Sequence, residues 1–379
     1  MSTVDTGAST EASTPSRVHA LDQLRALAML AGVLFHAALA YSPLLQPWWL
    51  TSDRQSWSGV DALIWLPHLI RMPLFFLIAG YFTALLLARD GMGGLARQRV
   101  RRILIPFLVA WPLVHLATSL STGWALTHVE HPSALLVLIR EWSTKPDAPS
   151  MPLTTGHLWF LYYLLLFSLL VWIGRTLGWG DALAGLKQRG PWVLVVGLPL
   201  VLWPGFLLTG APHPAPEGLL PQVWALLVYG PFFLAGLGLH GQLARLAPLQ
   251  RWLWPGVLLV LALYLVFLLE LGGGATLGRT PWRWALIEAL IAGWGTLCAL
   301  LAGLRWLDRP SPAMQALAAS AYWTYLWHLP ILFALQYLLM DLAWAWPLKF
   351  LFAVTATLAL CIASYHWLVP HTRLRRHVG

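Results

Sequence analysis

Two ionisable side chains lie within the first apolar segment, LDQLRALAMLAGVLFHAALAYSP, where a charge is costly unless it is paired or faces a wet cavity. Arg25 and His36 are 11 residues apart, which at about 100° per residue places both side chains on one helix face, about 16 Å apart along the axis. Asp22 lies about one turn before Arg25 and can pair with it. Histidine changes protonation near neutral pH, so His36 is a candidate general base and Arg25 a candidate anion-binding group. A packing histidine and a snorkelling arginine are the alternatives.

The second apolar segment, PHLIRMPLFFLIAGYF, places His68 and Arg71 one turn apart. A guanidinium at that depth needs a carboxylate, backbone carbonyls or an anionic ligand. No Asp or Glu follows Asp61 within the segment, so the partner of Arg71 must come from another helix, from water or from a substrate. Arg71 is therefore a candidate for binding a carboxylate or a developing oxyanion, with a purely structural partner as the alternative.

Four arginines follow the second segment in ARDGMGGLARQRVRRILIP, next to glycines that we expect to be flexible. The four are Arg97, Arg99, Arg101 and Arg102. Such a cluster suits a ligand with several phosphates, although anionic lipid headgroups would be attracted equally well. A phosphate-bearing substrate and the lipid surface are thus both open as its partner.

Polar side chains recur in two later segments. His157 opens the segment HLWFLYYLLLF, and Ser320, Thr324 and His328 form a stripe at i, i+4 and i+8 in SAYWTYLWHLP, with Tyr325 one turn before His328. Hydrogen bonding between helices is the alternative to a functional stripe. No segment carries a His-x3-His or His-plus-carboxylate spacing, so no metal site is expected. Three further histidines are interpreted as structural: His115, His240 and His366.

The composition identifies the setting of these residues. Of 379 residues, 58% are hydrophobic and only 10% are charged, and the mean hydropathy is +0.66. These values exclude an ordinary soluble domain, a disordered chain and a fibrous protein. The net charge of +9 is spread over short patches between apolar segments, so we expect no nucleic-acid partner. The two cysteines, Cys298 and Cys361, lie inside apolar segments and offer neither a disulfide framework nor a thiolate metal site.

The apolar segments predict an all-α polytopic membrane protein of about ten transmembrane helices. The segments cover approximately residues 20–41, 62–88, 103–121, 157–174, 191–209, 222–240, 251–271, 283–304, 319–340 and 346–369. Residues 1–18 are predicted to be a disordered cytoplasmic tail without a signal peptide, residues 19–371 the ten-helix domain, and residues 372–379 a basic cytoplasmic tail. The interruptions are too short to hold a separate enzyme domain, so any catalysis belongs to the helices.

Basic residues between the segments predict the orientation. With the N-terminus inside, sixteen Lys and Arg fall on the inner side and six on the outer side. This asymmetry favours cytoplasmic termini and an even number of helices. Tryptophans at the segment edges, including Trp48 and Trp49, are interpreted as an aromatic belt. PLFFLIAGYF at 73–82 and GPFFLAGLGL at 230–239 resemble each other, but both run in the same direction, so they are not interpreted as an inverted transporter repeat.

Five motifs together resemble the acyltransferase 3 superfamily of membrane enzymes, and within it the OpgC/MdoC-like branch of osmoregulated periplasmic glucan succinyltransferases. They are LDQLRALAMLAGVLFHAALAYSP, RMPLFFLIAGYF, HLWFLYYLLLF, GPFFLAGLGL and YLWHLP. The resemblance covers essentially the whole chain after the N-terminal tail. It implies a ten-helix enzyme of the bacterial inner membrane that takes an acyl group from cytoplasmic acyl-coenzyme A and delivers it to a periplasmic glycan.

The resemblance also implies roles for single residues. His36 corresponds to the catalytic histidine and Arg25 to the arginine that faces the donor, while Arg71 and His328 match motif positions in the second and the late helix. With the donor that the resemblance implies, coenzyme A phosphates are expected on Arg97, Arg99, Arg101 and Arg102, and substrate is expected on His68, His157 and Tyr325. His36 would deprotonate a sugar hydroxyl or accept the acyl group itself.

The expected partners are acyl-coenzyme A, a periplasmic glucan or another envelope glycan, and membrane lipids, with no permanently bound cofactor. The branch favours a succinyl donor, and Arg71 is the candidate cation for its distal carboxylate. The first alternative is an O-acetyltransferase acting on another envelope glycan or lipid. Two more distant ones are a secondary transporter, which should show symmetric halves and broken helices, and a membrane scaffold, which needs no charge within its helices.

Overall fold

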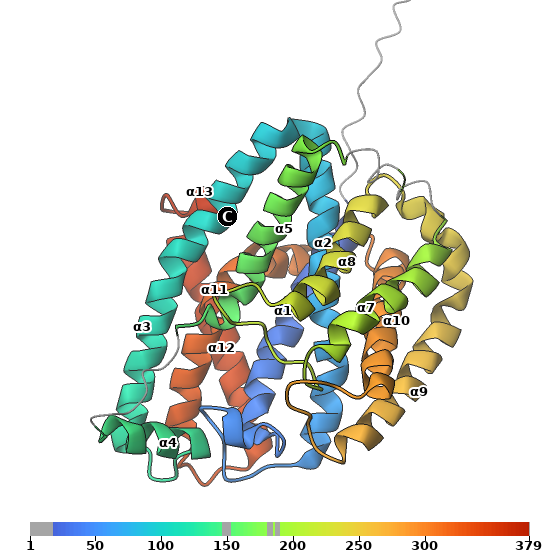
Figure 1. The fold of residues 1–379 in the computed structure, drawn as a ribbon. Helices are drawn as coiled ribbons and strands as arrows, with labels where there is room; N and C mark the ends of the chain where they lie inside the picture. The colour runs from blue at the N-terminus through green and yellow to red at the C-terminus, as the bar shows by residue number, and fades with distance from the viewer. Residues whose placement is uncertain (1–17, 146–152, 180–184, 186–189, 379) are drawn as a thin grey trace, which may run out of the picture.

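The computed structural model describes residues 18–145, 153–179, 185 and 190–378, which are helical with no β-strand among them (Figure 1). The predicted N-terminal tail falls almost entirely outside these residues. The principal helices are α1 (His19–Ala38), α2 (Ser58–Arg99), α3 (Ile105–His128), α4 (Ala134–Ser143), α5 (Trp159–Thr176), α7 (Leu198–Leu207), α8 (Val223–Leu239), α9 (Leu253–Leu271), α10 (Trp282–Trp306), α11 (Pro312–Leu339), α12 (Trp346–Leu368) and α13 (Arg375–Val378).

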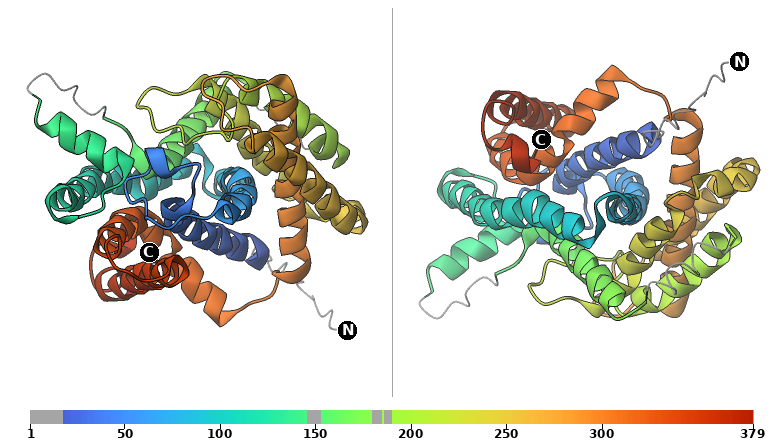
Figure 2. Two further views of the ribbon diagram at one scale, coloured as in Figure 1. Left: turned by 90° about the horizontal axis from the view of Figure 1, so that it is seen from below. Right: turned by 90° about the horizontal axis from the view of Figure 1, so that it is seen from above.

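The helix α1 lies inside the bundle together with α2, and the other long helices surround them (Figure 2). Its sequence explains this position, because alanines and a glycine occupy several faces and let neighbouring helices approach closely. Ala20, Ala26 and Ala37 are completely buried, and Gly32 is buried as well. The packing of α1 against α2, α10 and α11 fixes the direction of each side chain along it.

The helices α2 and α8 cross at a pair of glycines. A Cβ atom on Gly80 would clash with the carbonyl oxygen of Phe233, and one on Gly236 would clash with the carbonyl oxygen of Leu77. Each glycine therefore lets the backbone of the partner helix come into contact, as small residues do in membrane helix pairs. The two similar sequences at 73–82 and 230–239 are the two sides of this crossing.

The stretch that contains the predicted flexible glycines is helical. The helix α2 continues to Arg99 and is interrupted at Gly91, where φ is +67° and ψ is −168°. A residue with a side chain rarely adopts this left-handed φ, so a glycine suits the kink. A π-helical turn at Val100–Leu104 then leads directly into α3. The arginines are thus held on helical backbone rather than on a loop.

The bundle has two different ends. The arginine end contains the beginning of α1, the end of α2 and α13, so both ends of the described chain lie there (Figure 1). The loop end contains residues 42–57, α4 and residues 272–281. The helices α5 and α8 begin near the middle of the bundle and extend only toward the arginine end (Figure 1). Irregular backbone at such depth is tolerated where it is buried in protein or lines a cavity.

At the loop end, residues 42–57 are tied to the helices by a buried ion pair. Lys349 Nζ donates a hydrogen bond to Asp53 Oδ2 at 2.7 Å, and both side chains are buried. Thr51 Oγ1 donates to Gln336 Oε1 at 2.7 Å in the same region. Removal of one partner of such a pair would leave an uncompensated buried charge, which is strongly destabilising. The segment after α1 is therefore held firmly over the bundle.

Six described helical stretches are long and apolar enough to cross a membrane. They are His19–Tyr41, Ser58–His128, Gly156–Thr176, Leu243–Leu271, Trp282–Trp306 and Trp346–Leu368, with Val193–Leu207 and Val223–Leu239 as shorter apolar helices. The prediction of an all-helical polytopic fold is confirmed to this extent. Each of the ten predicted apolar segments coincides with a helix, but the count of ten spans and the cytoplasmic termini stay predictions.

Candidate functional site

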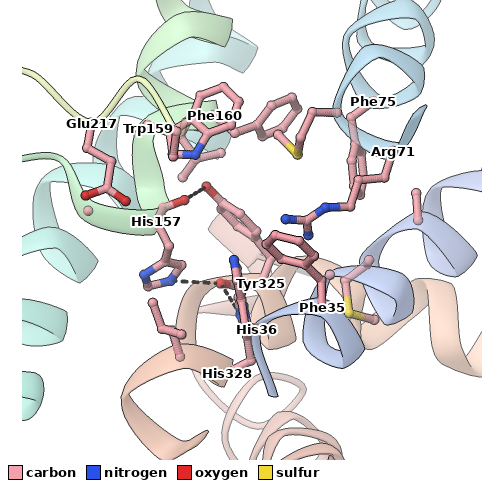
Figure 3. Close-up of a pocket in the computed structure, with 18 of the residues that line it drawn as sticks. Phe35, His36, Arg71, Phe75, His157, Trp159, Phe160, Glu217, Tyr325 and His328 are labelled. Atoms are coloured by element: carbon pink, nitrogen blue, oxygen red, sulfur yellow. Dashed lines mark hydrogen bonds between the residues drawn. The ribbon is translucent and has the colours of Figure 1, made fainter. Parts of the chain in front are cut away.

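A cavity of about 1240 Å³ extends through the bundle from the arginine end toward the loop end. Its wall includes Arg99 and Arg102 at the first end, and Trp49, Leu50 and residues 275–278 at the second. Between them it is lined by the predicted site residues His36, Arg71, His157, Tyr325 and His328, which come from α1, α2, α11 and the 3₁₀ turn Gly156–Leu158 just before α5 (Figure 3). The tertiary structure thus gathers residues that are as many as 292 positions apart in the chain.

A direct polar contact joins two histidine rings of this group. His36 Nδ1 lies 2.9 Å from His328 Nε2, and the rings are stacked with centroids 5.1 Å apart. His328 Nδ1 faces two backbone carbonyl oxygens of its own helix, those of Thr324 at 3.1 Å and Tyr325 at 2.9 Å. Carbonyl oxygens only accept hydrogen bonds, so the proton of neutral His328 is assigned to Nδ1 and its Nε2 carries the lone pair.

This assignment determines the tautomer of His36. Because His328 Nε2 accepts, His36 Nδ1 must donate, and neutral His36 therefore has its lone pair on Nε2. No hydrogen-bond partner for this Nε2 occurs among the described residues. A histidine whose tautomer is fixed by a second group and whose other nitrogen is available has the arrangement of a general base or a nucleophile.

The third member of the histidine cluster, defined here as His36, His157 and His328, fixes the position of α11. His157 Nε2 lies 3.2 Å from the carbonyl oxygens of both Tyr325 and Leu326, and the Tyr325 hydroxyl donates to the carbonyl oxygen of His157 at 2.7 Å (Figure 3). The His157 ring also contacts His328 edge to face at 5.1 Å. His157 and Tyr325 thus hold the start of α5 against α11 and orient the ring of His328.

Arg71 of α2 packs against α1 at Gly32, which lies about one helical turn before His36. A Cβ atom on Gly32 would clash with Arg71 Nη1, so the guanidinium occupies space that only a glycine leaves. Its Cζ lies 4.6 Å from the centroid of the Phe35 ring. The side chain is buried, and no described residue accepts a hydrogen bond or forms an ion pair with it. Arg71 is therefore a buried cation in the cavity wall with no anionic partner in the described part of the chain.

His68 is close to a buried acidic group that the motif analysis missed. His68 Nε2 lies 3.4 Å from the backbone carbonyl oxygen of His213, and His213 Nδ1 lies 4.0 Å from Glu288 Oε2. Glu288 is completely buried on α10, within a predicted apolar segment, so the rule that singled out Arg71 would also have found it. His213 lies in the segment between α7 and α8, which has no helical periodicity from which the position of its side chains could be predicted. The same segment contains Glu217, which lines the cavity.

The predicted donor-binding residues at the arginine end fall into two groups, those that line the cavity and those that do not. Arg25, Arg99 and Arg102 line the cavity, together with Arg89, Gln98 and His377, which the motifs did not indicate. Arg97 and Arg101 are exposed and are absent from the lining. Arg99 is held in place by hydrogen bonds from Nε to Ser168 Oγ at 2.9 Å and from Nη2 to Thr83 Oγ1. Several cations at one end of an elongated cavity suit a ligand with a polyanionic head and a long arm.

The described residues contain no group of three or more His, Cys, Asp or Glu side chains placed to hold a metal ion. The site offers a histidine with a free nitrogen, a buried cation in the same cavity wall, and hydroxyl and carbonyl groups that orient the rings. Such a set can transfer a proton or an acyl group and stabilise a developing negative charge.

The comparisons with known proteins agree with this chemistry. The sequence model of a protein family described as "Acyltransferase domain" matches residues 18–366. The chain is 26% identical over 338 residues to the protein named "Glucans biosynthesis protein C" of Salmonella paratyphi B, covering 83% of this chain and 82% of that protein. Proteins of the same name from Salmonella dublin and Salmonella typhi match with the same identity and coverage. No solved structure matches the chain.

Proposed function

The chain belongs to the acyltransferase 3 family, and on that premise we propose that it moves an acyl group from acyl-coenzyme A to a hydroxyl group of a cell-envelope glycan. The observation that carries the proposal is the His36–His328 contact, which leaves the Nε2 lone pair of His36 available in a cavity that arginines line at one end. We place the protein in a bacterial inner membrane, with the arginine end on the cytoplasmic side and the loop end on the periplasmic side. This orientation follows from the excess of basic residues on the side of the arginine end.

The donor fits the cavity by charge and length. Coenzyme A would place its phosphates on Arg99 and Arg102 and extend its pantetheine arm past Arg25 toward His36. About 16 Å separate Arg25 and His36 along an ideal helix, a distance that an extended arm rather than a compact head must cover. The thioester would then lie beside Arg71.

The transfer exchanges one bond for another. The acceptor oxygen attacks the thioester carbonyl carbon while its proton passes to His36 Nε2, the tetrahedral oxyanion lies near Arg71, and the carbon–sulfur bond breaks as the proton passes to the thiolate. In a two-step route, His36 Nε2 attacks the thioester carbonyl carbon and the carbon–sulfur bond breaks, which releases the coenzyme A thiolate. The acceptor oxygen then attacks the acyl-histidine, the nitrogen–carbon bond breaks, and the hydroxyl proton leaves through His36 Nε2 to the thiolate. Both routes use the same nitrogen, and an acyl-histidine trapped without acceptor would identify the second.

We propose succinyl as the acyl group and a glucan as the acceptor. The named relatives are glucan biosynthesis proteins, and a dicarboxylic acyl group supplies the anion that Arg71 lacks among the described residues. An acetyl group would not need Arg71 for charge neutralisation. The Arg71 environment therefore favours the succinyl donor over the acetyl donor.

The test uses the full-length protein in lipid nanodiscs with succinyl- or acetyl-coenzyme A and a soluble β-glucan. We expect release of coenzyme A and acylation of the glucan, detected by mass spectrometry, with faster turnover of succinyl-coenzyme A. Arg71→Gln should erode this preference, whereas Arg140→Gln, on α4 outside the cavity lining, should not. A preference of the unmodified protein for acetyl-coenzyme A refutes the succinyl assignment alone, and absence of transfer from both donors to any glycan refutes the acyltransferase proposal.

A further inference from the structure

The segment between α7 and α8, residues 208–222, enters the bundle and forms part of the cavity wall. Two contacts fix it: Ala211 N donates to Thr276 Oγ1 at 2.8 Å, and the carbonyl oxygen of Glu217 accepts from Thr155 N at 2.8 Å and from Thr155 Oγ1 at 3.0 Å. Because Thr155 is two residues before His157, these bonds hold Glu217 beside the histidine cluster.

The Glu217 side chain is half-buried in the cavity wall. It lines the cavity on the same side as His157 (Figure 3). The described residues supply neither a hydrogen bond nor an ion pair to its carboxylate oxygens. Burial raises the pKa of this carboxyl to about 7. A half-buried acceptor without a donor is costly, and a ligand hydroxyl would satisfy it.

A polar stretch of the wall connects Glu217 with the loop end. His115 and Thr118 of α3 and Thr154 line the cavity next to this segment, and Leu135 of α4 follows toward the loop end. His115 Nε2 donates to the carbonyl oxygen of Thr154 at 2.8 Å. The cavity-lining arginines of the donor end belong to the opposite part of the bundle. This stretch therefore offers hydrogen-bonding groups without a cation, and it lies between the histidine cluster and the side on which the acceptor is proposed to enter.

We propose that Glu217 binds hydroxyl groups of the acceptor, so that this polar stretch is the acceptor subsite and its ligand is a saccharide that presents neighbouring hydroxyls. This inference rests on the acyltransferase function proposed above and adds a residue and a ligand class to it. A carboxylate accepts hydrogen bonds from two hydroxyls at once, and Thr118 and Thr154 can exchange further hydrogen bonds with the same sugar. Glu217 would orient the acceptor, while proton or acyl transfer belongs to His36.

The test separates acceptor binding from donor chemistry. Full-length protein in nanodiscs is assayed twice, for acyl transfer to a soluble β-glucan and for slow hydrolysis of the acyl-coenzyme A donor without glucan. We expect Glu217→Gln to raise the KM for the glucan about tenfold, equivalent to about 1.4 kcal/mol, and to leave donor hydrolysis within about twofold. Glu217→Asp should recover part of the loss. The control is Glu141→Gln, an exposed carboxylate on α4.

Each outcome decides one question. An unchanged glucan KM in Glu217→Gln, in protein that still transfers the acyl group, overturns the acceptor subsite and leaves the acyltransferase function standing. Equal loss of transfer and of donor hydrolysis in both Glu217 variants also overturns it, because a residue that binds only the acceptor should spare the donor reaction. If the unmodified protein acylates no glycan at all, the proposed function fails first.

Discussion

Replacement of His328 tests the tautomer assignment on which the proposed chemistry depends. In His328→Ala, the Nδ1–H of His36 loses the acceptor that lies 2.9 Å away. The imidazole can then carry its proton on Nε2 instead, where it blocks the lone pair that must accept a proton or attack the thioester. We therefore expect a lower kcat with an unchanged affinity for the donor.

The structure sets the size of this effect. An unsatisfied buried N–H costs about 1 to 3 kcal/mol, and this is the penalty that the reactive tautomer acquires in His328→Ala. At 1.36 kcal/mol per factor of ten, kcat should fall about 5- to 150-fold. His36→Ala should cost more, about 10² to 10⁴, because it removes the reacting nitrogen itself. In His328→Gln, the side-chain carbonyl oxygen can accept the hydrogen bond from His36 Nδ1–H, so this variant should retain part of the activity.

The assay compares the initial rate of coenzyme A release by His328→Ala, His36→Ala and the double variant. His366→Ala, an exposed histidine on α12 outside the cavity lining, is the control. Residues that act as one unit are not additive, so the double variant should be no slower than His36→Ala. A normal kcat in His328→Ala, or a double variant whose loss equals the product of the single losses, would refute the reasoning.

Three further outcomes follow from the charges and the packing. A reporter fused after Gly379 should be active only in the cytoplasm, as the excess of inner basic residues requires, and periplasmic activity would reverse the orientation. Arg102→Gln should raise the KM for the donor severalfold and reduce the salt dependence of this KM. Arg97→Gln, outside the cavity lining, should change neither. Equal effects of the two substitutions would mean that the cavity lining does not identify the donor site. Gly80→Val should destabilise the protein in detergent by about 1 to 3 kcal/mol, while the same change at Gly123, where a Cβ meets open space, should have little effect on thermal unfolding.

Membership of the acyltransferase 3 family, predicted from five short motifs, is confirmed by the match over residues 18–366. The helical class is also confirmed, because runs of apolar residues near the thickness of a bilayer have few alternatives to a helix. The similar segments around Gly80 and Gly236 were not interpreted as a transporter repeat. Their likeness has a local cause: each supplies the small residue that one side of the α2–α8 crossing needs.

The positions of the helices, and the residues that share one helix, could be predicted from the sequence because both follow from local composition and a repeat of 3.6 residues. The placement of Arg25 and His36 on α1, and of Thr324 and His328 on α11, needed nothing else. A pattern within one helix, however, contains no information on how that helix is rotated against its neighbours.

Which of these residues meet depends on how the helices pack against one another. The rotation of α11 against α1 brings His328 Nε2 to His36 Nδ1 and thereby selects the tautomer of His36, and the absence of a side chain at Gly32 admits the guanidinium of Arg71. The path of residues 208–222 through the bundle brings Glu217 to the cavity, although this proline-rich segment has no helical period to indicate where it goes. Such contacts depend on packing between elements distant in the chain, and packing is a property of the whole fold.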